Sequence, residues 1–187
     1  MNIVLFGPPG AGKGTQAKYL VKKINGFQIS TGDMLRDEIK KNSDVGKMII
    51  NDMNDGKFVS DEIVNKLIQN VIFDEKKKNK LIFDGYPRSL SQAKNLDSIL
   101  DSSGQKIDFI FFLNVTKNVI IKRIEKRRKE EKRSDDSLET ILRRYDTYMA
   151  TTKPVLEYYS KNPNFHELDG TLEIDQITNK IDTFLGV

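Results

Sequence analysis

A glycine-rich segment near the start of the chain has the residue types and spacing of a phosphate-binding loop. It reads Gly-Pro-Pro-Gly-Ala-Gly-Lys-Gly-Thr over residues 7–15, directly after the apolar run 2–6 and before a helical pattern. Glycines tolerate positive φ and let the backbone approach a ligand, so successive N–H groups can converge on phosphate oxygens at a helix N-terminus. Lys13 adds a compact positive charge. The segment therefore predicts binding of a nucleoside triphosphate.

The end of this loop departs from the generic pattern. A Ser or Thr usually follows the lysine directly, whereas Gly14 follows Lys13 here and the hydroxyl comes one residue later, at Thr15. The spacing alone therefore does not assign Thr15 as a metal ligand.

A second group of polar residues follows an expected strand over 27–30. We expect Gly32 to form a turn and Asp33 to cap a helix, with Arg36 one helical turn further along. An ordinary strand-to-helix junction would account for these residues except Arg36.

A third group stands at the end of an expected buried strand over 80–84. This strand delivers Asp84 at its carboxyl end, the edge at which α/β sheets bind ligands, where the carboxylate can orient the water shell of Mg²⁺. Gly85 and Pro87 shape a loop that points the planar donors of Arg88 at the same edge. The alternative for Arg88 is a surface ion pair.

A basic segment covers residues 122–133, with eight Lys or Arg against three Glu. By composition alone, such a run is typical of a solvated helix face. In a chain with a triphosphate loop, however, Arg123 and Arg127 share one helix face, and Arg133 and Arg144 flank the acidic pair 135–136. This spacing suggests a flap that places cations on the phosphates.

Length and composition indicate one compact domain. The chain has 187 residues with 37% hydrophobic content, enough for a single α/β core. The sequence shows no signal-peptide pattern and no apolar run of membrane-spanning length, so we expect a cytoplasmic protein without a membrane partner. The absence of cysteine and the single histidine, His166, argue against a zinc site, so any metal must be held by oxygen. A net charge of +4 is too small to indicate nucleic acid.

Short β-branched and aromatic runs alternate with amphipathic helical patterns along the chain. We expect strands over 2–6, 27–30, 80–84, 108–115 and 165–168. We expect helices over 15–24, 33–41, 44–54, 61–74, 91–102, 116–131, 137–160 and 173–185, with an interruption at Pro154. The near-continuous apolarity of 109–113 indicates burial on both faces of a sheet. The pattern predicts an α/β fold like that of P-loop NTPases, a doubly wound, five-stranded parallel sheet with helices on both faces.

These motifs together resemble those of the adenylate kinase family, among the nucleoside monophosphate kinases. The resemblance runs the length of the chain and is carried by residues 7–17, 29–36, 55–59 and 84–88 and by Asp135, Asp136 and Arg144. A glycine after the loop lysine is usual in this family. The resemblance implies a core of 1–29, 60–125 and 137–187, an insert for the nucleoside monophosphate at 30–59 and a mobile lid of the short form at 126–136.

The resemblance also implies roles for individual residues. The ATP-binding residues would be Gly10, Ala11, Gly12, Lys13, Gly14, Thr15, Arg123, Arg127 and, through its backbone, Leu172. The AMP-binding residues would be Thr31, Arg36, Lys57, Phe58, Val59, Gly85, Tyr86, Pro87, Arg88, Gln92, Arg133 and Arg144. Catalysis would rest on Lys13, Arg88, Arg123, Arg133 and Arg144 with Mg²⁺. Two departures are Phe58, where the family commonly has an aliphatic residue, and a lid without a glycine before Arg133.

The expected reaction is reversible transfer of a phosphoryl group from Mg-ATP to AMP, giving two ADP, in a chain expected to be a monomer. A UMP or CMP kinase is the nearest alternative; similar chains of that kind usually carry alanine in place of Thr31 and lack Gln92. A regulatory P-loop switch and a nucleic-acid-binding protein are further alternatives. No Asn-Lys-x-Asp segment for guanine is present.

Overall fold

The strands form one parallel sheet in the computed structural model, which describes residues 1–131 and 137–186. The strands are β1 (Ile3–Phe6), β2 (Phe27–Ser30), β3 (Leu81–Asp84), β4 (Phe109–Asn114) and β5 (Phe165–Asp169). Their order across the sheet is β2-β3-β1-β4-β5, and all four pairings are parallel. All five strands that the sequence predicts are confirmed, and they place Leu5 of β1 opposite Asp84 of β3, next to the phosphate loop.

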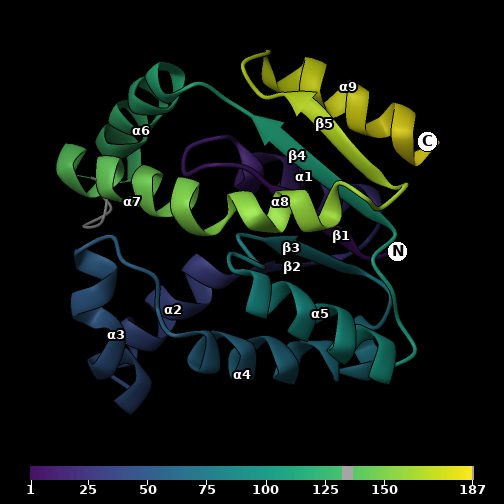
Figure 1. The fold of residues 1–187 in the computed structure, drawn as a ribbon, viewed down its shortest axis with the longest axis horizontal. Coiled ribbons are helices and arrows are strands. Elements are labelled where there is room, and N and C mark those ends of the chain that lie inside the picture. Colours follow the sequence, from purple (N-terminus) through teal and green to yellow (C-terminus); the bar gives the residue numbers. More distant parts are fainter. Residues whose placement is uncertain (132–136, 187) are drawn as a thin grey trace.

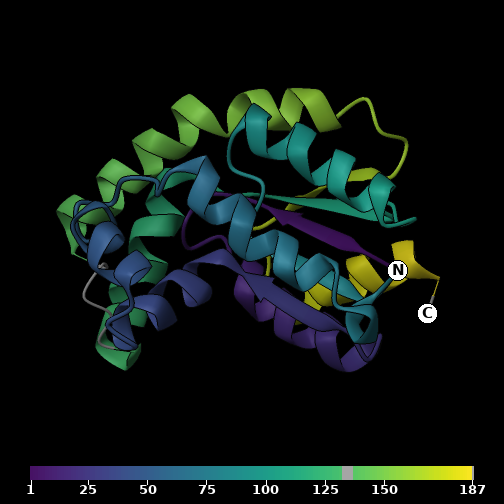
Figure 2. The same cartoon turned by 90° about the horizontal axis from the view of Figure 1, so that it is seen from below.

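Helices cover both faces of this sheet (Figures 1 and 2). Alternate strand residues point to opposite faces: Val4 packs into one core cluster with side chains of α4 (Asp61–Ile72), α5 (Leu90–Ser102) and α8 (Lys153–Tyr159). Leu5 packs into the other cluster with α1 (Lys13–Lys23), α6 (Lys117–Glu131) and α9 (Ile174–Leu185). The doubly wound α/β class is therefore confirmed.

The helix α7 (Leu138–Thr151) is separated from α8 at Thr152, as the proline predicts. Pro154 lies in the first turn of α8 and has no N–H to donate to the preceding turn, so one continuous helix over 137–160 cannot form. The short helix Glu75–Lys77 occupies the lysine-rich turn before β3. None of the helices in the described part of the chain combines the length and the apolar character that spanning a bilayer requires.

Two expected helix starts were wrong by two residues. The helix α1 begins at Lys13 rather than at Thr15, because Gly12 adopts φ 98° as its N-cap and its carbonyl accepts from the Thr15 and Gln16 N–H groups. The helix α2 (Thr31–Lys40) begins before Asp33.

The cap of α2 also differs from the expectation. Ser30 rather than Asp33 caps this helix, since its hydroxyl accepts from the Asp33 N–H at 3.3 Å. Gly32 therefore belongs to the first helical turn and forms no separate turn.

The helices α2 and α3 (Asp44–Asn54) project from the carboxyl end of the sheet as a pair (Figure 1). They pack closely, because a Cβ added at Gly46 of α3 would lie 2.2 Å from the Glu38 carbonyl oxygen of α2. The start of α7 reaches the end of this pair, where the Thr140 hydroxyl donates to the Asn54 carbonyl at 3.4 Å. The segment 30–59 and the helices next to the expected lid thus meet at the same end of the sheet.

Candidate active site

The phosphate loop wraps around the N-terminus of α1. Gly10 has φ 79°, and a Cβ added there would lie 2.8 Å from the Ile124 side chain of α6. The Ala11 N–H donates to the Pro8 carbonyl at 3.1 Å and closes the turn. Gly10 and Gly12 thus stand where the backbone has left-handed φ.

Lys13 lies inside this loop. Its ammonium group donates to the carbonyls of Gly7 and Pro8 at 2.7 and 2.9 Å. Burial lowers the pKa of Lys13 to about 8; the Asp84 carboxylate acts in the opposite direction, and the positive charges of nearby arginines lower the pKa further. These arginines are Arg88, Arg144 and Arg127. The ammonium group therefore lies among one carboxylate and three arginines, and these cations suit a polyanion.

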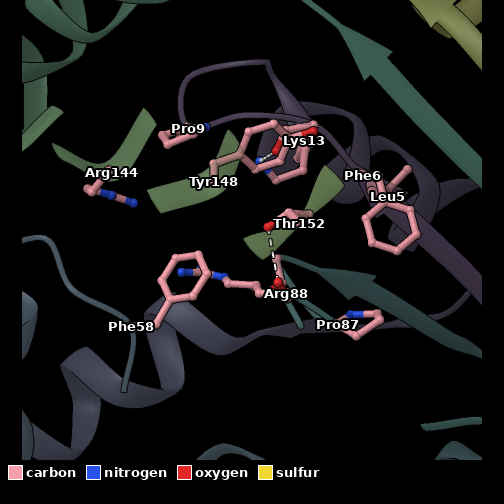
Figure 3. A pocket seen from close by; sticks show the side chains of 12 residues that line it. Leu5, Phe6, Pro9, Lys13, Phe58, Pro87, Arg88, Arg144, Tyr148 and Thr152 are labelled. Carbon is pink, nitrogen blue, oxygen red and sulfur yellow. Dashed lines mark hydrogen bonds between the residues drawn. The ribbon is translucent and has the colours of Figure 1, made fainter. Parts of the chain in front are cut away.

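A cavity of about 430 Å³ opens beside Lys13 (Figure 3). It lies between the phosphate loop, the loop after β3 and one face of α7 and α8. The residues that line it are Leu5, Phe6, Gly7, Pro9, Lys13, Phe58, Gly85, Pro87, Arg88, Arg144, Tyr148 and Thr152. The sequence analysis missed Tyr148 and Thr152, although their spacing from Arg144 places all three on one helix face.

Arg88 forms hydrogen bonds through both its backbone and its side chain beside this cavity. Its N–H donates to the Gln92 side-chain oxygen at 2.7 Å, and its carbonyl accepts from the Thr152 hydroxyl at 3.1 Å. Its guanidinium Nε donates to the Gly85 carbonyl at 2.7 Å. Gly85 has φ 78°, and a Cβ there would lie 2.9 Å from the guanidinium. The Gly-Tyr-Pro-Arg loop therefore brings the Arg88 side chain to the cavity.

A second cavity of about 350 Å³ adjoins the first, because Phe58, Arg88 and Arg144 line both. Its other lining residues are Gly32, Leu35, Arg36, Met53, Gly56 and Lys57. Arg36 forms an ion pair with Asp33 at 2.5 Å, and the exposed Lys57 pairs with Asp55 at 2.9 Å. The two cavities and their shared arginines therefore form one continuous site lined by cations.

Several predicted AMP-site residues do not line either cavity with their side chains. Tyr86 is 1% exposed and donates to Asn65, and Val59 packs in the core. Thr31 is also buried, and its hydroxyl donates to the Gly85 carbonyl at 2.8 Å.

Gln92 is likewise turned into the protein. Its amide nitrogen donates to Asp61 at 2.6 Å, and Asp61 also accepts from the Ser89 hydroxyl. Asp61 therefore orients the amide that supports Arg88, a role that the sequence analysis missed because only the fold brings residues 61 and 92 together.

Asp84 provides a carboxylate that fits a hydrated metal ion beside the loop. One oxygen accepts from Gln28 at 3.0 Å, and the same oxygen would lie 3.4 Å from a Cβ added at Gly14. Its charge also raises the pKa of Lys13 against the effect of burial. Within the described ranges, no three His, Cys, Asp or Glu side chains gather into a metal-binding cluster. The position of the Asp84 carboxylate beside the phosphate loop fits a metal ion that arrives with a phosphate ligand.

Part of the basic segment faces the phosphate loop. Arg123 of α6 donates to the Ala11 carbonyl at 3.3 Å, and Arg127 acts on the Lys13 charge. Lys126 and Arg128 are exposed, as a solvated helix face would be. Arg133 lies outside the described residues. Leu172 follows β5 and packs against the core cluster of α9.

Comparisons with known proteins agree with this geometry. The family model for adenylate kinase matches residues 5–164. The chain is 51% identical to an adenylate kinase of Pelagibacter ubique, with both chains fully covered, and that relative carries residues that this chain lacks. It is 41% identical to an adenylate kinase of Mycoplasma capricolum over 97% of each chain. It is also 43% identical to one of Caulobacter sp. strain K31 over 100% of this chain and 99% of the relative. The chain combines a phosphate loop beside two arginine-lined cavities with these relatives. It therefore belongs to the adenylate kinase family.

Proposed function

We propose that the chain catalyses reversible phosphoryl transfer from Mg-ATP to AMP, giving two ADP. The observation that carries this proposal is the junction of the two cavities at Arg88 and Arg144. One cavity contains the lysine of a triphosphate loop, and the other is lined by Arg36 and Lys57. Two phosphate groups bound there would meet between the shared arginines, which is the arrangement that direct in-line transfer requires.

The chemistry needs no general base. The second pKa of a phosphate monoester is about 6, so the AMP phosphate is mostly a dianion at neutral pH and its oxygen is already a nucleophile. The remaining task is to align two polyanions and to stabilise charge on the migrating group. Lys13, Arg88 and Arg144 reach the first cavity and suit this task, with Arg123 and Arg133 as further cations.

We also propose binding roles for individual residues. For ATP we propose residues 10–15, Arg123, Arg127 and the Leu172 backbone, since α6 and the loop face each other. For AMP we propose Arg36, Lys57, Phe58, Gly85, Pro87, Arg88 and Arg144 as cavity residues, together with Thr31, Tyr86, Val59, Gln92 and Arg133. Tyr86, Val59 and Gln92 would act through their backbone or after a rearrangement, because their side chains are turned into the protein.

Mg²⁺ would enter with ATP. When bound, it would neutralise phosphate charge, and Asp84 would hold its water shell. We further propose that residues 30–59 and 126–136 move on the core 1–29, 60–125 and 137–187, and that closure of the lid excludes water as a competing acceptor. A cytoplasmic monomer is the expected form.

A donor and acceptor screen with purified protein tests the function. Mg-ATP with AMP should yield ADP, and Mg²⁺ with ADP should yield ATP and AMP. The chain carries Thr31 and Gln92, the two residues that distinguish it from UMP and CMP kinases. UMP and CMP should therefore be much poorer acceptors than AMP. Comparable turnover of CMP and AMP would reassign the substrate. Retention on DNA with a steep salt dependence, without ADP formation, would instead favour nucleic-acid binding.

A further inference from the structure

Phe58 makes an aromatic contact with the guanidinium group of Arg88. The guanidinium carbon lies 5.1 Å from the centroid of the Phe58 ring, within the range of a cation–π interaction. Figure 3 shows the ring beside the nitrogen end of the arginine side chain. Phe58 follows α3, whereas Arg88 follows β3, so the contact joins the projecting pair of helices to the sheet.

The ring and a backbone carbonyl restrict different parts of the same guanidinium. Arg88 Nε donates to the Gly85 carbonyl at 2.7 Å, which holds the guanidinium from the side of the loop after β3. The Phe58 ring contacts the same guanidinium from the side of the segment after α3 and so restrains it at a second point. Phe58 and Arg88 also line both cavities, so the orientation of the guanidinium plane decides where the donors of Arg88 point within the shared site.

We infer that Phe58 is a positioning residue for Arg88, which orients the guanidinium toward the acceptor phosphate through its aromatic face. This inference rests on the proposed function for its kinetic consequence. The contact itself can be tested without any nucleotide. The aromatic character of the side chain, rather than its apolar volume, is the feature required.

The kinetic test compares Phe58→Leu with Phe58→Tyr. Leu keeps an apolar side chain but has no π face, so kcat/KM for AMP should fall about five- to thirtyfold, the scale of a partly desolvated cation–π contact. Tyr keeps the ring and should stay within about twofold of the wild type. Phe27→Leu is the matched control. It removes a ring whose centroid lies 5.9 Å from the Lys77 ammonium group, and neither residue lines a cavity. This control should leave kcat/KM unchanged.

A double-mutant cycle separates orientation of Arg88 from a direct effect of the ring. In an Arg88→Ala background there is no guanidinium to orient, so Phe58→Leu should change AMP affinity, measured by calorimetry, by less than about twofold. An equal loss in both backgrounds would overturn the inference, as would wild-type kcat/KM in Phe58→Leu.

The nucleotide-free readout is the NMR signal of the Arg88 Nε–H, assigned by its absence in Arg88→Lys. The ring current of Phe58 should displace this signal in the wild type and in Phe58→Tyr, and the displacement should disappear in Phe58→Leu. Identical signals in all three proteins would overturn the contact. Failure of the wild type to form ADP would overturn the proposed function. The NMR comparison would still decide whether Phe58 contacts the Arg88 guanidinium.

Discussion

At the scale of single residues, neutral groups direct the charges of Arg88 and Lys13 in the first cavity. Arg88 has its backbone N–H and carbonyl engaged by Gln92 and Thr152, while its side chain donates to Gly85. Lys13 is directed by two carbonyls of its own loop. Each cation thus reaches the cavity in a prepared position, which reduces the reorganisation needed when phosphates bind.

Replacing Arg88 with Lys should reduce turnover by at least about a hundredfold, the scale of losing one preorganised donor to a transition-state oxygen. Lys keeps the charge but loses the planar fork and the Nε–H that donates to Gly85. Thermal melting should change little, because Arg88 is only half-buried. Steady-state ADP production and calorimetric melting measure both effects.

The exposed neighbour of Arg144 provides the control for this substitution. Arg143→Lys changes an arginine whose ion pair with Glu139 is solvent-exposed, so turnover should be unaffected. Near wild-type turnover in Arg88→Lys would show that the fork of Arg88 does not contact the reacting phosphates.

The lowered pKa of Lys13 predicts a pH dependence of ATP binding. Burial lowers this pKa to about 8, so the free enzyme loses the Lys13 charge as the pH rises through that value. Accordingly, kcat/KM for ATP, which reports the free enzyme, should fall above about pH 8. Bound phosphates favour the charged form, so kcat should fall only at a higher pH. Profiles from pH 6.5 to 10 test this, with kcat/KM for ATP measured at AMP concentrations far below saturation and kcat at saturating AMP and ATP. A kcat/KM that stays flat to pH 10 would contradict the prediction.

At the scale of elements, the close pairing of α2 with α3 sets the shape of the second cavity. Arg36 lies on α2, and Lys57 follows α3, so the separation of the two helices fixes the separation of these cations. Gly46 permits this pairing, since a side chain there would collide with the backbone of Glu38 rather than with a flexible side-chain end.

Gly46→Ala should therefore destabilise the protein by about 1–3 kcal/mol, the usual cost of overpacking, although alanine favours helices. It should also raise KM for AMP several-fold, because α3 must move away from α2. Asn51→Ala on the exposed side of α3 is the control and should change neither value appreciably. Denaturant unfolding and AMP kinetics measure the two effects. Lowered stability with an unchanged KM for AMP would show that the spacing of α2 and α3 does not affect AMP binding.

At the scale of the whole molecule, the sequence predicts the features that depend on local patterns, such as strands and helix ends. Five β-branched or aromatic runs became the five strands, and Pro154 ended a helix where its missing N–H required it. Contacts between distant segments could not be predicted in this way. Asn2 is fully buried, donates to Gln105 and accepts from the Leu81 N–H, a network that exists only once the sheet has formed.

The same limit applied to the site. The motifs predicted which residues gather at the carboxyl end of the sheet, but no periodicity indicated that Gln92 faces Asp61 or that Phe58 faces Arg88. The cap of α2 was misassigned because serine and aspartate are both good N-caps, and only the backbone decides between neighbouring candidates.

The proposed lid gives a prediction for the whole molecule. Replacing residues 126–136 with a short Gly/Ser segment removes Arg127 and Arg133 but leaves the phosphate loop and the Arg36 cavity. AMP binding should survive, whereas phosphoryl transfer should fall by at least about a thousandfold, and a larger share of ATP turnover should be hydrolysis. Calorimetry with AMP and a paired ADP and phosphate assay measure these effects.

The basic run before β3 serves as the control for the loss of charge. Changing Lys76, Lys77 and Lys78 to Ser removes three cations from a turn that lines neither cavity, so transfer should be unchanged. Transfer within a few-fold of the wild type after replacement of 126–136 would identify the basic segment as an ordinary solvated helix face.

The carbonyl oxygen of Gly85 accepts two hydrogen bonds, from the Thr31 hydroxyl of α2 and from the Arg88 guanidinium. One acceptor thus serves a residue proposed to recognise the base and a residue proposed to hold the phosphate. We expect a base that draws the Thr31 hydroxyl away to strengthen the remaining hydrogen bond from Arg88 to this oxygen, which would couple the two halves of the acceptor nucleotide through one atom. A phosphate compound without a base should consequently lose more acceptor activity than the missing base contacts alone would remove.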